Sequence, residues 1–212
     1  MKKFKTLIIF DWDDTLFPTS WVVGNDIDLA DPKTQNKFIV YFSRLDMLLY
    51  KLLTTCIKYG TVFIVTNAVI KWVQVSSSML PNTQKIINNN IKILSARDTY
   101  QSDYPDRMDL WKRLTFQDLV FNNFDKHKDK HKDKYKHQHI ISIGDAEHEF
   151  NALINLYNES SITKDRLLKT IRCIKNPSFE SLIDELEVLN SCIIKVLTTT
   201  DHMDLKFKDK KK

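Results

Sequence analysis

The stretch TLIIFDWDDTL, residues 6–16, decides the predicted fold. Its first five residues form an unbroken β-favouring run, which is typical of a strand buried on both faces of a parallel sheet. Acidic residues follow at once. Because alternate residues of an extended segment point the same way, Asp11 and Asp13 are expected to face one site. The stretch therefore predicts a buried strand that delivers two carboxylates to its carboxyl end.

Further short β-favouring runs follow along the chain, separated by segments whose apolar residues have helical spacing. The predicted strands after the first are residues 61–65, 91–94, 139–143 and 168–174. The predicted helices are residues 36–59, 69–79, 82–90, 109–122, 147–157 and 178–197. This alternation predicts an α/β fold, a Rossmann-like doubly wound parallel sheet with helices on both faces. We expect residues 17–35 to form a loop or flap, and Gly60 to end the helix before it.

Polar residues stand directly after several of the predicted strands. Thr66 and Asn67 follow the second strand, and Asp145 follows the fourth. Ligands of open parallel sheets bind at the carboxyl ends of the strands. We therefore expect these side chains to share one site with Asp11 and Asp13.

The motifs of this site resemble those of a known superfamily. The pattern D-x-D-x-T at Asp11, Asp13 and Thr15 resembles the first signature of the haloacid dehalogenase (HAD) superfamily of aspartyl-nucleophile phosphatases. Residues 63–67 resemble the second signature, and residues 144–149 resemble the fourth, GDxxxD, with Glu149 in its last place. Longer stretches resemble a little-characterised eukaryotic branch of the superfamily: residues 11–21, 64–81, 93–116, 144–153 and 169–186.

The resemblance implies a role for each residue of these motifs. Asp11 would attack phosphorus and form an aspartyl-phosphate, and Asp13 would protonate the leaving oxygen and later activate water. Thr66 and Asn67 would bind the phosphate. Thr15 would not contact the substrate itself but would help to hold Asp11 and Asp13 in place.

The resemblance also implies a magnesium site. Asp145 would bind Mg²⁺ together with the Asp11 carboxylate and the backbone carbonyl of Asp13. Such an all-oxygen site suits Mg²⁺, whose remaining ligands are phosphate and water. Mn²⁺ accepts the same ligands, so the sequence does not separate the two metals.

The third signature is a single cation at the start of a helix, and Lys112 fits it best. It would neutralise charge on the nucleophile and on the phosphoryl group. Arg113, Arg97 and Lys85 are the alternatives. Glu149 is expected to orient a water or this cation, with Glu147 as the weaker candidate for that role.

Two short gaps indicate that no large cap domain covers the site. Residues 17–35 and 95–109 are the places where relatives insert a cap, and neither is long enough for a folded domain. An open site admits a bulky phosphorylated substrate such as a phosphoprotein. The alternatives are a small-metabolite phosphatase closed by the flap or by a partner, and a non-catalytic phosphate-binding scaffold on the same fold.

Composition bounds the remaining possibilities. The net charge is +5, and most of it lies in a low-complexity Lys/His insertion, residues 125–138, and a basic tail, residues 201–212. The rest, expected to be one domain over residues 1–200, is close to neutral, which argues against a specific nucleic-acid surface. Cys56, Cys173 and Cys192 lack disulfide or metal-site spacing and fit reduced thiols. No stretch suits a membrane span or a signal peptide. We therefore expect an intracellular, cytoplasmic protein without a membrane partner; nuclear import through the tail is the alternative.

Overall fold

The computed structural model describes residues 4–125, 137–158 and 166–208. Within these residues the strands form one six-stranded, all-parallel sheet in the order β3-β2-β1-β4-β5-β6. The strands are β1 (Phe4–Phe10), β2 (Thr61–Thr66), β3 (Lys92–Ser95), β4 (His137–Gly144), β5 (Arg166–Arg172) and β6 (Met203–Lys206). This order runs outward in both directions from the β1–β4 pair, as in Rossmann-like folds, so the predicted fold class is confirmed.

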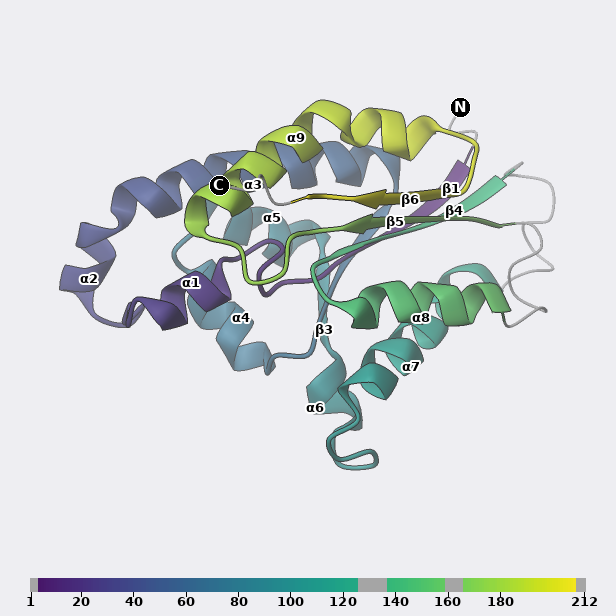
Figure 1. Cartoon of the computed structure of the whole chain (residues 1–212), viewed down its shortest axis with the longest axis horizontal. Helices are drawn as coiled ribbons and strands as arrows, with labels where there is room; N and C mark the ends of the chain where they lie inside the picture. Colours follow the sequence, from purple (N-terminus) through teal and green to yellow (C-terminus); the bar gives the residue numbers. More distant parts are fainter. Residues whose placement is uncertain (1–3, 126–136, 159–165, 209–212) are drawn as a thin grey trace.

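Helices cover both faces of this sheet (Figure 1). They are α1 (Thr19–Gly24), α2 (Pro32–Lys37), α3 (Ile39–Tyr59), α4 (Ile70–Ser77), α5 (Pro81–Asn90), α6 (Ala96–Tyr100), α7 (Met108–Val120), α8 (Glu147–Asn158) and α9 (Phe179–Thr198), and a π-helical turn, Phe121–Asp125, extends α7. Helices α3, α5 and α9 lie on one face, and α7 and α8 on the other.

Strand β1 lies at the centre because it is apolar on both faces. Ile8 and Phe10 belong to the core cluster that contains α3 and α9. Leu7 and Ile9, which alternate with them, belong to the cluster that contains α7 and α8. All four side chains are at most 1% exposed. Close packing on both faces fixes the position and orientation of the carboxyl end of β1, where the acidic residues begin.

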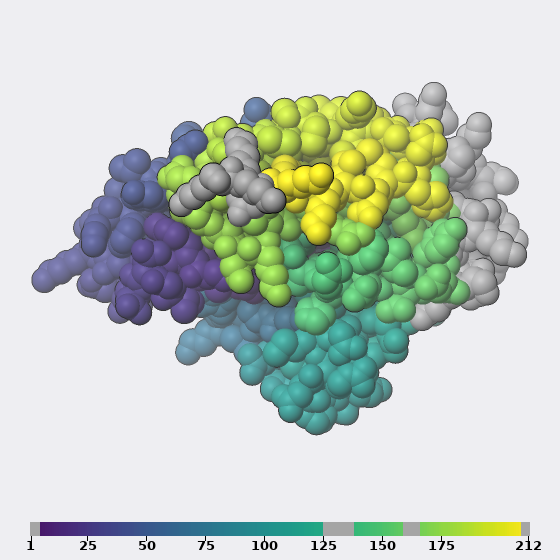
Figure 2. Space-filling view, in the orientation of Figure 1, coloured from purple at the N-terminus to yellow at the C-terminus, as the bar shows by residue number. Residues whose placement is uncertain are grey.

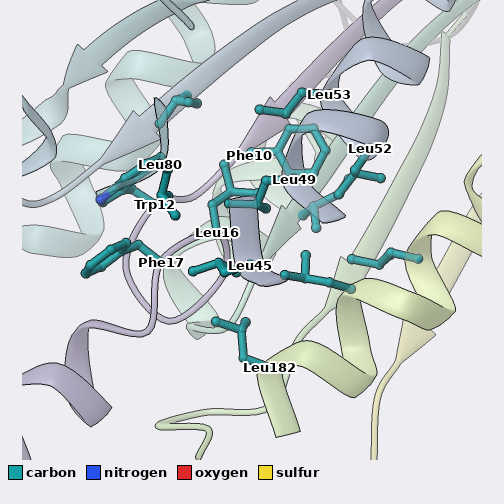
Figure 3. Packing of buried hydrophobic residues seen from close by; sticks show 14 of the residues in the cluster. Phe10, Trp12, Leu16, Phe17, Leu45, Leu49, Leu52, Leu53, Leu80 and Leu182 are labelled. Atoms are coloured by element: carbon teal, nitrogen blue, oxygen red, sulfur yellow. The ribbon is translucent and has the colours of Figure 1, made fainter. Parts of the chain in front are cut away.

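The core continues past β1 into the loop that follows (Figure 3). Trp12, Leu16 and Phe17 are fully buried, and the rings of Trp12 and Phe17 stack with centroids 5.9 Å apart. The Trp12 indole N–H also donates to Ser76 Oγ at 2.9 Å. The apolar residues of the loop therefore anchor it to the core and hold the intervening acids in a fixed position at the carboxyl end of β1.

The segments beside the site are short, as the sequence predicted. Residues 17–35, expected as a loop or flap, contain helix α1 and the start of α2, while residues 95–107 contain α6. Figure 2 shows α1 and α2 (purple to blue) at one end of the molecule and the α6 region (teal) as a separate protrusion. Neither segment has the size of a folded domain.

One detail of the fold differs from the sequence-based expectation, and a second detail, at Gly60, confirms the expectation and adds a further reason for it. The segment predicted as a solvated tail begins with strand β6, which pairs with β5 from Lys169–Met203 to Arg172–Lys206. Arg172 further binds Asp204 across this pair, with Nε 2.9 Å from Oδ1. Gly60 does end α3, but a Cβ there would also lie 2.5 Å from the backbone oxygen of Thr6, so close packing against β1 requires glycine.

Two predicted segments lie largely or partly outside the described residues. They are the Lys/His insertion, of which residues 126–136 are not described, and the end of the basic tail, residues 209–212. Over the ranges that are described, no helix has the length and apolar character needed to cross a membrane.

Candidate active site

The loop after β1 presents the first group of site residues. The backbone N–H groups of Leu16 and Phe17 both donate to the carbonyl of Trp12 at 2.9 Å, which closes a tight turn. Asp14 occupies this turn with φ 52°, a left-handed conformation that a short polar side chain tolerates. Ser20 N donates to Asp14 Oδ1 at 2.8 Å, which ties the turn to helix α1.

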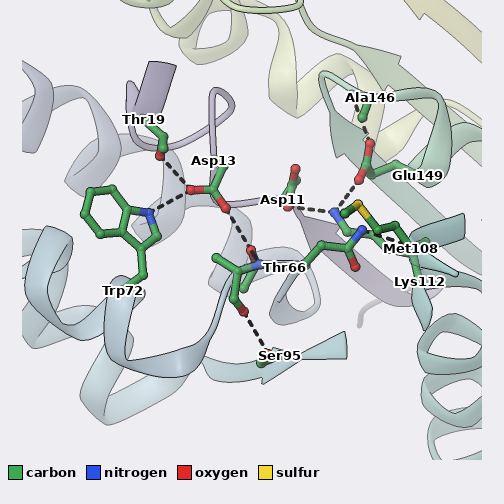
Figure 4. A network of polar contacts seen from close by, with 12 residues as sticks. Asp11, Asp13, Thr19, Thr66, Trp72, Ser95, Met108, Lys112, Ala146 and Glu149 are labelled. Carbon is green, nitrogen blue, oxygen red and sulfur yellow. Dashed lines mark hydrogen bonds and ion pairs between the residues drawn. The ribbon is translucent and has the colours of Figure 1, made fainter. Parts of the chain in front are cut away.

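Asp11 lies beside a buried cation. Lys112 Nζ, from helix α7, is 2.7 Å from Asp11 Oδ1, and the Lys112 side chain is 1% exposed. The same ammonium donates to Glu149 Oε1 from helix α8, while the second oxygen of Glu149 accepts from Ala146 N at 3.0 Å (Figure 4). Three elements, β1, α7 and α8, thus bring one lysine between two carboxylates.

Glycine is required where Glu149 approaches the sheet. A Cβ at Gly144 would lie 2.5 Å from Glu149 Cγ, which is closer than real Cβ contacts come. Gly144 therefore leaves the space that Glu149 fills on its way to Lys112. The glycine of the GDxxxE pattern has this packing role in the structure.

The electrostatics of the site show an excess of negative charge. Burial raises the pKa of Asp11 above its ordinary value, while Lys112 acts in the opposite direction. Burial lowers the pKa of Lys112, but the carboxylates of Asp11 and Glu149 outweigh it, so the pKa of Lys112 is raised. Burial, followed by Glu149 and Asp14, raises the pKa of Asp145 to about 7. Five carboxylates line the cavity beside two permanent cations, Lys112 and Arg97.

A divalent cation fits this excess of charge. One carboxylate oxygen from each of Asp11, Asp145 and Glu149 can be chosen so that all lie within 4.8 Å of one another. This all-oxygen set has the ligand chemistry that Mg²⁺ prefers. Asp11 and Asp145 are the carboxylates that the sequence predicted for the metal. Glu149 joins the cluster although it was predicted only to orient a neighbouring group.

Asp13 has quite different surroundings from Asp11. Its Oδ1 accepts hydrogen bonds from Thr19 Oγ1 at 2.6 Å and from the Trp72 indole N–H at 2.8 Å. Its Oδ2 accepts from Thr66 Oγ1 at 3.0 Å. The donors come from α1, α4 and the end of β2, so three elements fix one carboxylate (Figure 4). All three donors are neutral.

The two residues predicted to bind phosphate lie in different places. Thr66 is fully buried, and its hydroxyl both donates to Asp13 and accepts from Ala68 N at 2.8 Å. Asn67 lines the cavity above the acids, and its Nδ2 donates to the carbonyl of Met108 at 3.3 Å. Its buried Oδ1 has no hydrogen-bond partner among the described residues. In this structure Thr66 thus contacts Asp13, whereas Asn67 faces the open space.

The structure also distinguishes among the residues considered for the cation of the third signature and for the glutamate beside it. Lys112 is the candidate cation that contacts Asp11. Lys85 is exposed on α5, and Arg97 lines the cavity with its Nε donating to Gln101 Oε1 at 2.9 Å. Glu149 is buried against Lys112, whereas the side chain of Glu147 is 68% exposed. Thr15 is a buried residue of the loop after β1, and its hydroxyl has no hydrogen-bond partner within the described part of the chain.

A cavity of about 550 Å³ opens above these groups. Its lining includes the acids of the loop, Lys112, Asp145 and Glu149, together with residues of α1, α4 and α7. The sequence indicated no role for Thr19 or Asp14, and no hydrogen bond from Trp72 to Asp13. Asp14 is the third acid of the DWDD motif. No local sequence pattern predicts the contacts of Thr19 and Trp72 with Asp13.

Comparison with known proteins gives one distant structural likeness. The sequence matches no protein-family model and no curated protein. Among solved structures, the chain is similar to the HAD domain of the effector protein Lem4 from Legionella pneumophila. The alignment covers 94% of this chain and 100% of that chain, with 12% sequence identity and a TM-score of 0.40. A likeness this distant supports no statement about activity.

Proposed function

We propose that this protein is a Mg²⁺-dependent phosphomonoester hydrolase of the HAD type that works through an aspartyl-phosphate on Asp11. The observation that carries the proposal is the contact between the Asp11 carboxylate and the buried Lys112 ammonium, beside Asp145 and Glu149, at the floor of an open cavity. A carboxylate at the end of a central strand, paired with a buried cation and facing open space, has the environment of a nucleophile.

In the proposed first step, an oxygen of Asp11 forms a bond to phosphorus while the bond from phosphorus to the ester oxygen breaks. Asp13 gives its proton to that departing oxygen. Lys112 stabilises the negative charge that gathers on the phosphoryl oxygens, and Glu149 holds Lys112 in place. Asp13, now ionised, takes a proton from water, whose oxygen then attacks phosphorus and frees both Asp11 and inorganic phosphate.

Asp11 and Asp145 would hold Mg²⁺, with Glu149 close enough to contribute. When bound, Mg²⁺ offsets the repulsion between a carboxylate nucleophile and an anionic phosphate. The predicted contribution of the Asp13 backbone carbonyl remains part of the proposal.

The open cavity favours a bulky substrate, including a phosphorylated side chain on a protein. A small-metabolite phosphatase remains the alternative because α1 borders the cavity through Thr19 and Val23 and is positioned to act as a flap. A phosphate-binding scaffold is disfavoured because Asp11, Asp13 and Lys112 are all present and all engaged in the site.

The test is hydrolysis of p-nitrophenyl phosphate by the purified chain with Mg²⁺, beside Asp11→Asn and an EDTA-treated sample. We expect turnover that is lost in both controls and returns when Mg²⁺ is restored after EDTA. An acid quench during turnover, followed by hydroxylamine, which converts an aspartyl-phosphate to a hydroxamate and releases inorganic phosphate, would locate the covalent bond at Asp11. No turnover by folded wild-type protein that binds Mg²⁺ would contradict the proposal and favour the scaffold.

A further inference from the structure

Three exposed apolar side chains line the cavity. Val23 comes from α1, Val69 immediately precedes α4, and Met108 is the first residue of α7. They are 65%, 39% and 52% exposed, respectively. We call these three residues the apolar wall. Single exposed apolar side chains are ordinary, but three from separate elements lining one cavity form a patch of the kind that binds ligands.

The backbone around the apolar wall is hydrogen-bonded to neighbouring residues. The carbonyl of Met108 accepts a hydrogen bond from Asn67. The N–H of Ile70, directly after Val69, donates to Asp98 Oδ2 at 2.9 Å. Val23 belongs to the helix whose first residue, Thr19, donates to Asp13. The backbone that carries the apolar wall is therefore already ordered before a ligand binds, which lowers the entropic cost of binding.

Charged side chains and the apolar wall line the same cavity. The phosphoryl group would react beside Asp11 and Lys112, and the group attached to it would extend toward the apolar wall. Arg97 and His148 also belong to the lining. Valine and methionine side chains offer a polyol no hydrogen bonds, so the hydroxyls of a sugar or glycerol would lose water there without compensation.

We propose that the apolar wall binds the leaving group, and that the preferred substrates are aryl phosphates, whose ring places apolar surface next to the phosphoryl group. This inference rests on the function proposed above. A ring is rigid and buries a large apolar area against such a wall at small entropic cost. The aryl group can belong to a small molecule or to a phosphotyrosyl side chain, because both present the same ring to the wall.

The experiment compares kcat/KM for phenyl phosphate and glycerol 2-phosphate in wild type and in a triple variant, Val23→Thr, Val69→Thr and Met108→Gln. These substitutions keep side-chain size while replacing apolar surface with polar groups at exposed positions. The inherent difference in reactivity between the two esters cancels when the ratio of their kcat/KM values is compared between proteins. We expect this ratio to fall about tenfold in the triple variant, mostly through phenyl phosphate.

Val188→Thr is the matched control, since Val188 is 49% exposed on α9 and is not among the residues that line the cavity. It should leave the ratio unchanged. An unchanged ratio in the triple variant, with both esters still hydrolysed, would overturn the inference and leave the proposed function intact. Hydrolysis of neither ester by folded wild type would overturn both.

A third substrate distinguishes the two sources of the ring. A phosphotyrosyl peptide hydrolysed with a higher kcat/KM than phenyl phosphate, and sensitive to the same triple variant, supports the inference with a protein substrate. Phenyl phosphate hydrolysed as well as the peptide supports it with small aryl esters. A peptide insensitive to the triple variant counts against the wall as the binding surface for the ring.

Discussion

Asp11 and Asp13 are two residues apart on one loop, yet the protein surrounds them in opposite ways. Asp11 is almost fully buried and contacts a charged partner, Lys112, which Glu149 in turn holds. Asp13 is half-buried and is held by three neutral donors, Thr19, Thr66 and Trp72. The surroundings of Asp11 offset its negative charge, whereas the surroundings of Asp13 fix the direction of its carboxylate.

This difference suits two different tasks. A nucleophile must stay in one place and have its charge offset when an anionic phosphate arrives, which a buried ammonium achieves. An acid–base residue must exchange protons with the substrate and with water, so it needs access and a fixed direction more than a compensating charge. Alternation along the loop makes both possible, because Trp12 between the two acids is buried in the core while Asp11 and Asp13 both line the cavity.

The largest expected effect comes from removing the charged partner of Asp11. Lys112→Met would leave Asp11 and Glu149 as neighbouring buried carboxylates without a cation. We expect kcat/KM to fall about 10³-fold or more, because the ammonium would stabilise the transferring phosphoryl group. Losing one partner of a buried ion pair should also cost about 3–5 kcal/mol in the free energy of unfolding, measured by urea denaturation.

Lys85→Met is the control for that substitution, because Lys85 is exposed on α5. It should change neither activity nor the urea midpoint measurably. Wild-type activity in Lys112→Met would show that the contact between Lys112 and Asp11 has only a structural role.

The next effect concerns Asp13 itself. Asp13→Asn keeps an acceptor for Thr19 and Trp72, and the Thr66 hydroxyl can turn to accept from the new amide, so the fold should survive. We expect kcat/KM to fall about 10²–10⁴-fold for phenyl phosphate, whose leaving group needs a proton. The fall should be much smaller for p-nitrophenyl phosphate, whose leaving group departs as an anion. Equal losses on both esters would contradict the role of Asp13 as the acid.

A smaller effect is expected where the sheet makes room for Glu149. Gly144→Ala would place a Cβ 2.5 Å from Glu149 Cγ and push that side chain away from Lys112. We expect kcat/KM and Mg²⁺ affinity to fall about 10–100-fold, as when a supporting residue of a metal site is lost. Mg²⁺ affinity can be measured by titration calorimetry.

The other two glycines of the chain provide the comparison. A Cβ at Gly24 meets nothing within 4 Å, so Gly24→Ala should leave activity and stability close to wild type. A Cβ at Gly60 would lie 2.5 Å from the Thr6 carbonyl oxygen. Gly60 precedes the amino end of β2, whereas the acids lie at the carboxyl ends of the strands, so Gly60→Ala should lower stability with little effect on Mg²⁺ affinity. A loss of Mg²⁺ affinity in Gly60→Ala as large as that in Gly144→Ala would show that the effect is general destabilisation.

The fold could be predicted because the local patterns of the central strands are strong. Residues 6–10 and 61–65 are predicted to be buried strands, and the structure contains them within β1 and β2. Strand β6 could not be predicted, since its four residues include Asp204 and Lys206 and lie on the edge of the sheet. Pairing with β5, including the Arg172–Asp204 ion pair, stabilises this strand, and a sequence window does not contain that partner.

The site was predictable to the same extent and for the same reason. Asp11 and Asp145 stand at strand ends, where topology alone brings them together. The hydrogen bond from Trp72 to Asp13 joins residues 59 positions apart. This hydrogen bond depends on how α4 packs beside the loop. A tryptophan in a sequence predicts a buried or half-buried aromatic side chain, but it does not predict which acceptor its indole N–H will bind.

The smallest expected effect tests that hydrogen bond. Trp72→Phe keeps an aromatic ring beside Phe17, whose centroid lies 6.0 Å from that of Trp72, but removes the indole N–H from Asp13 Oδ1. Because Thr19 still donates to the same oxygen, Asp13 should lose part of its orientation only. We expect kcat to fall about 3–10-fold, in keeping with the roughly 1 kcal/mol of one hydrogen bond. As for Asp13→Asn, phenyl phosphate should suffer more than p-nitrophenyl phosphate.

A double-mutant cycle decides whether Trp72 acts through Asp13 or through the shape of the cavity. If it acts through Asp13, Trp72→Phe should cause no further loss of activity in a protein that already carries Asp13→Asn, because the group it orients is no longer an acid. Additive losses, or a rise in KM without a change in kcat, would mean that the indole contacts the substrate directly. The neutral donors around Asp13 would then be part of the substrate-binding surface, and the contrast between the two aspartates would rest on Lys112 alone.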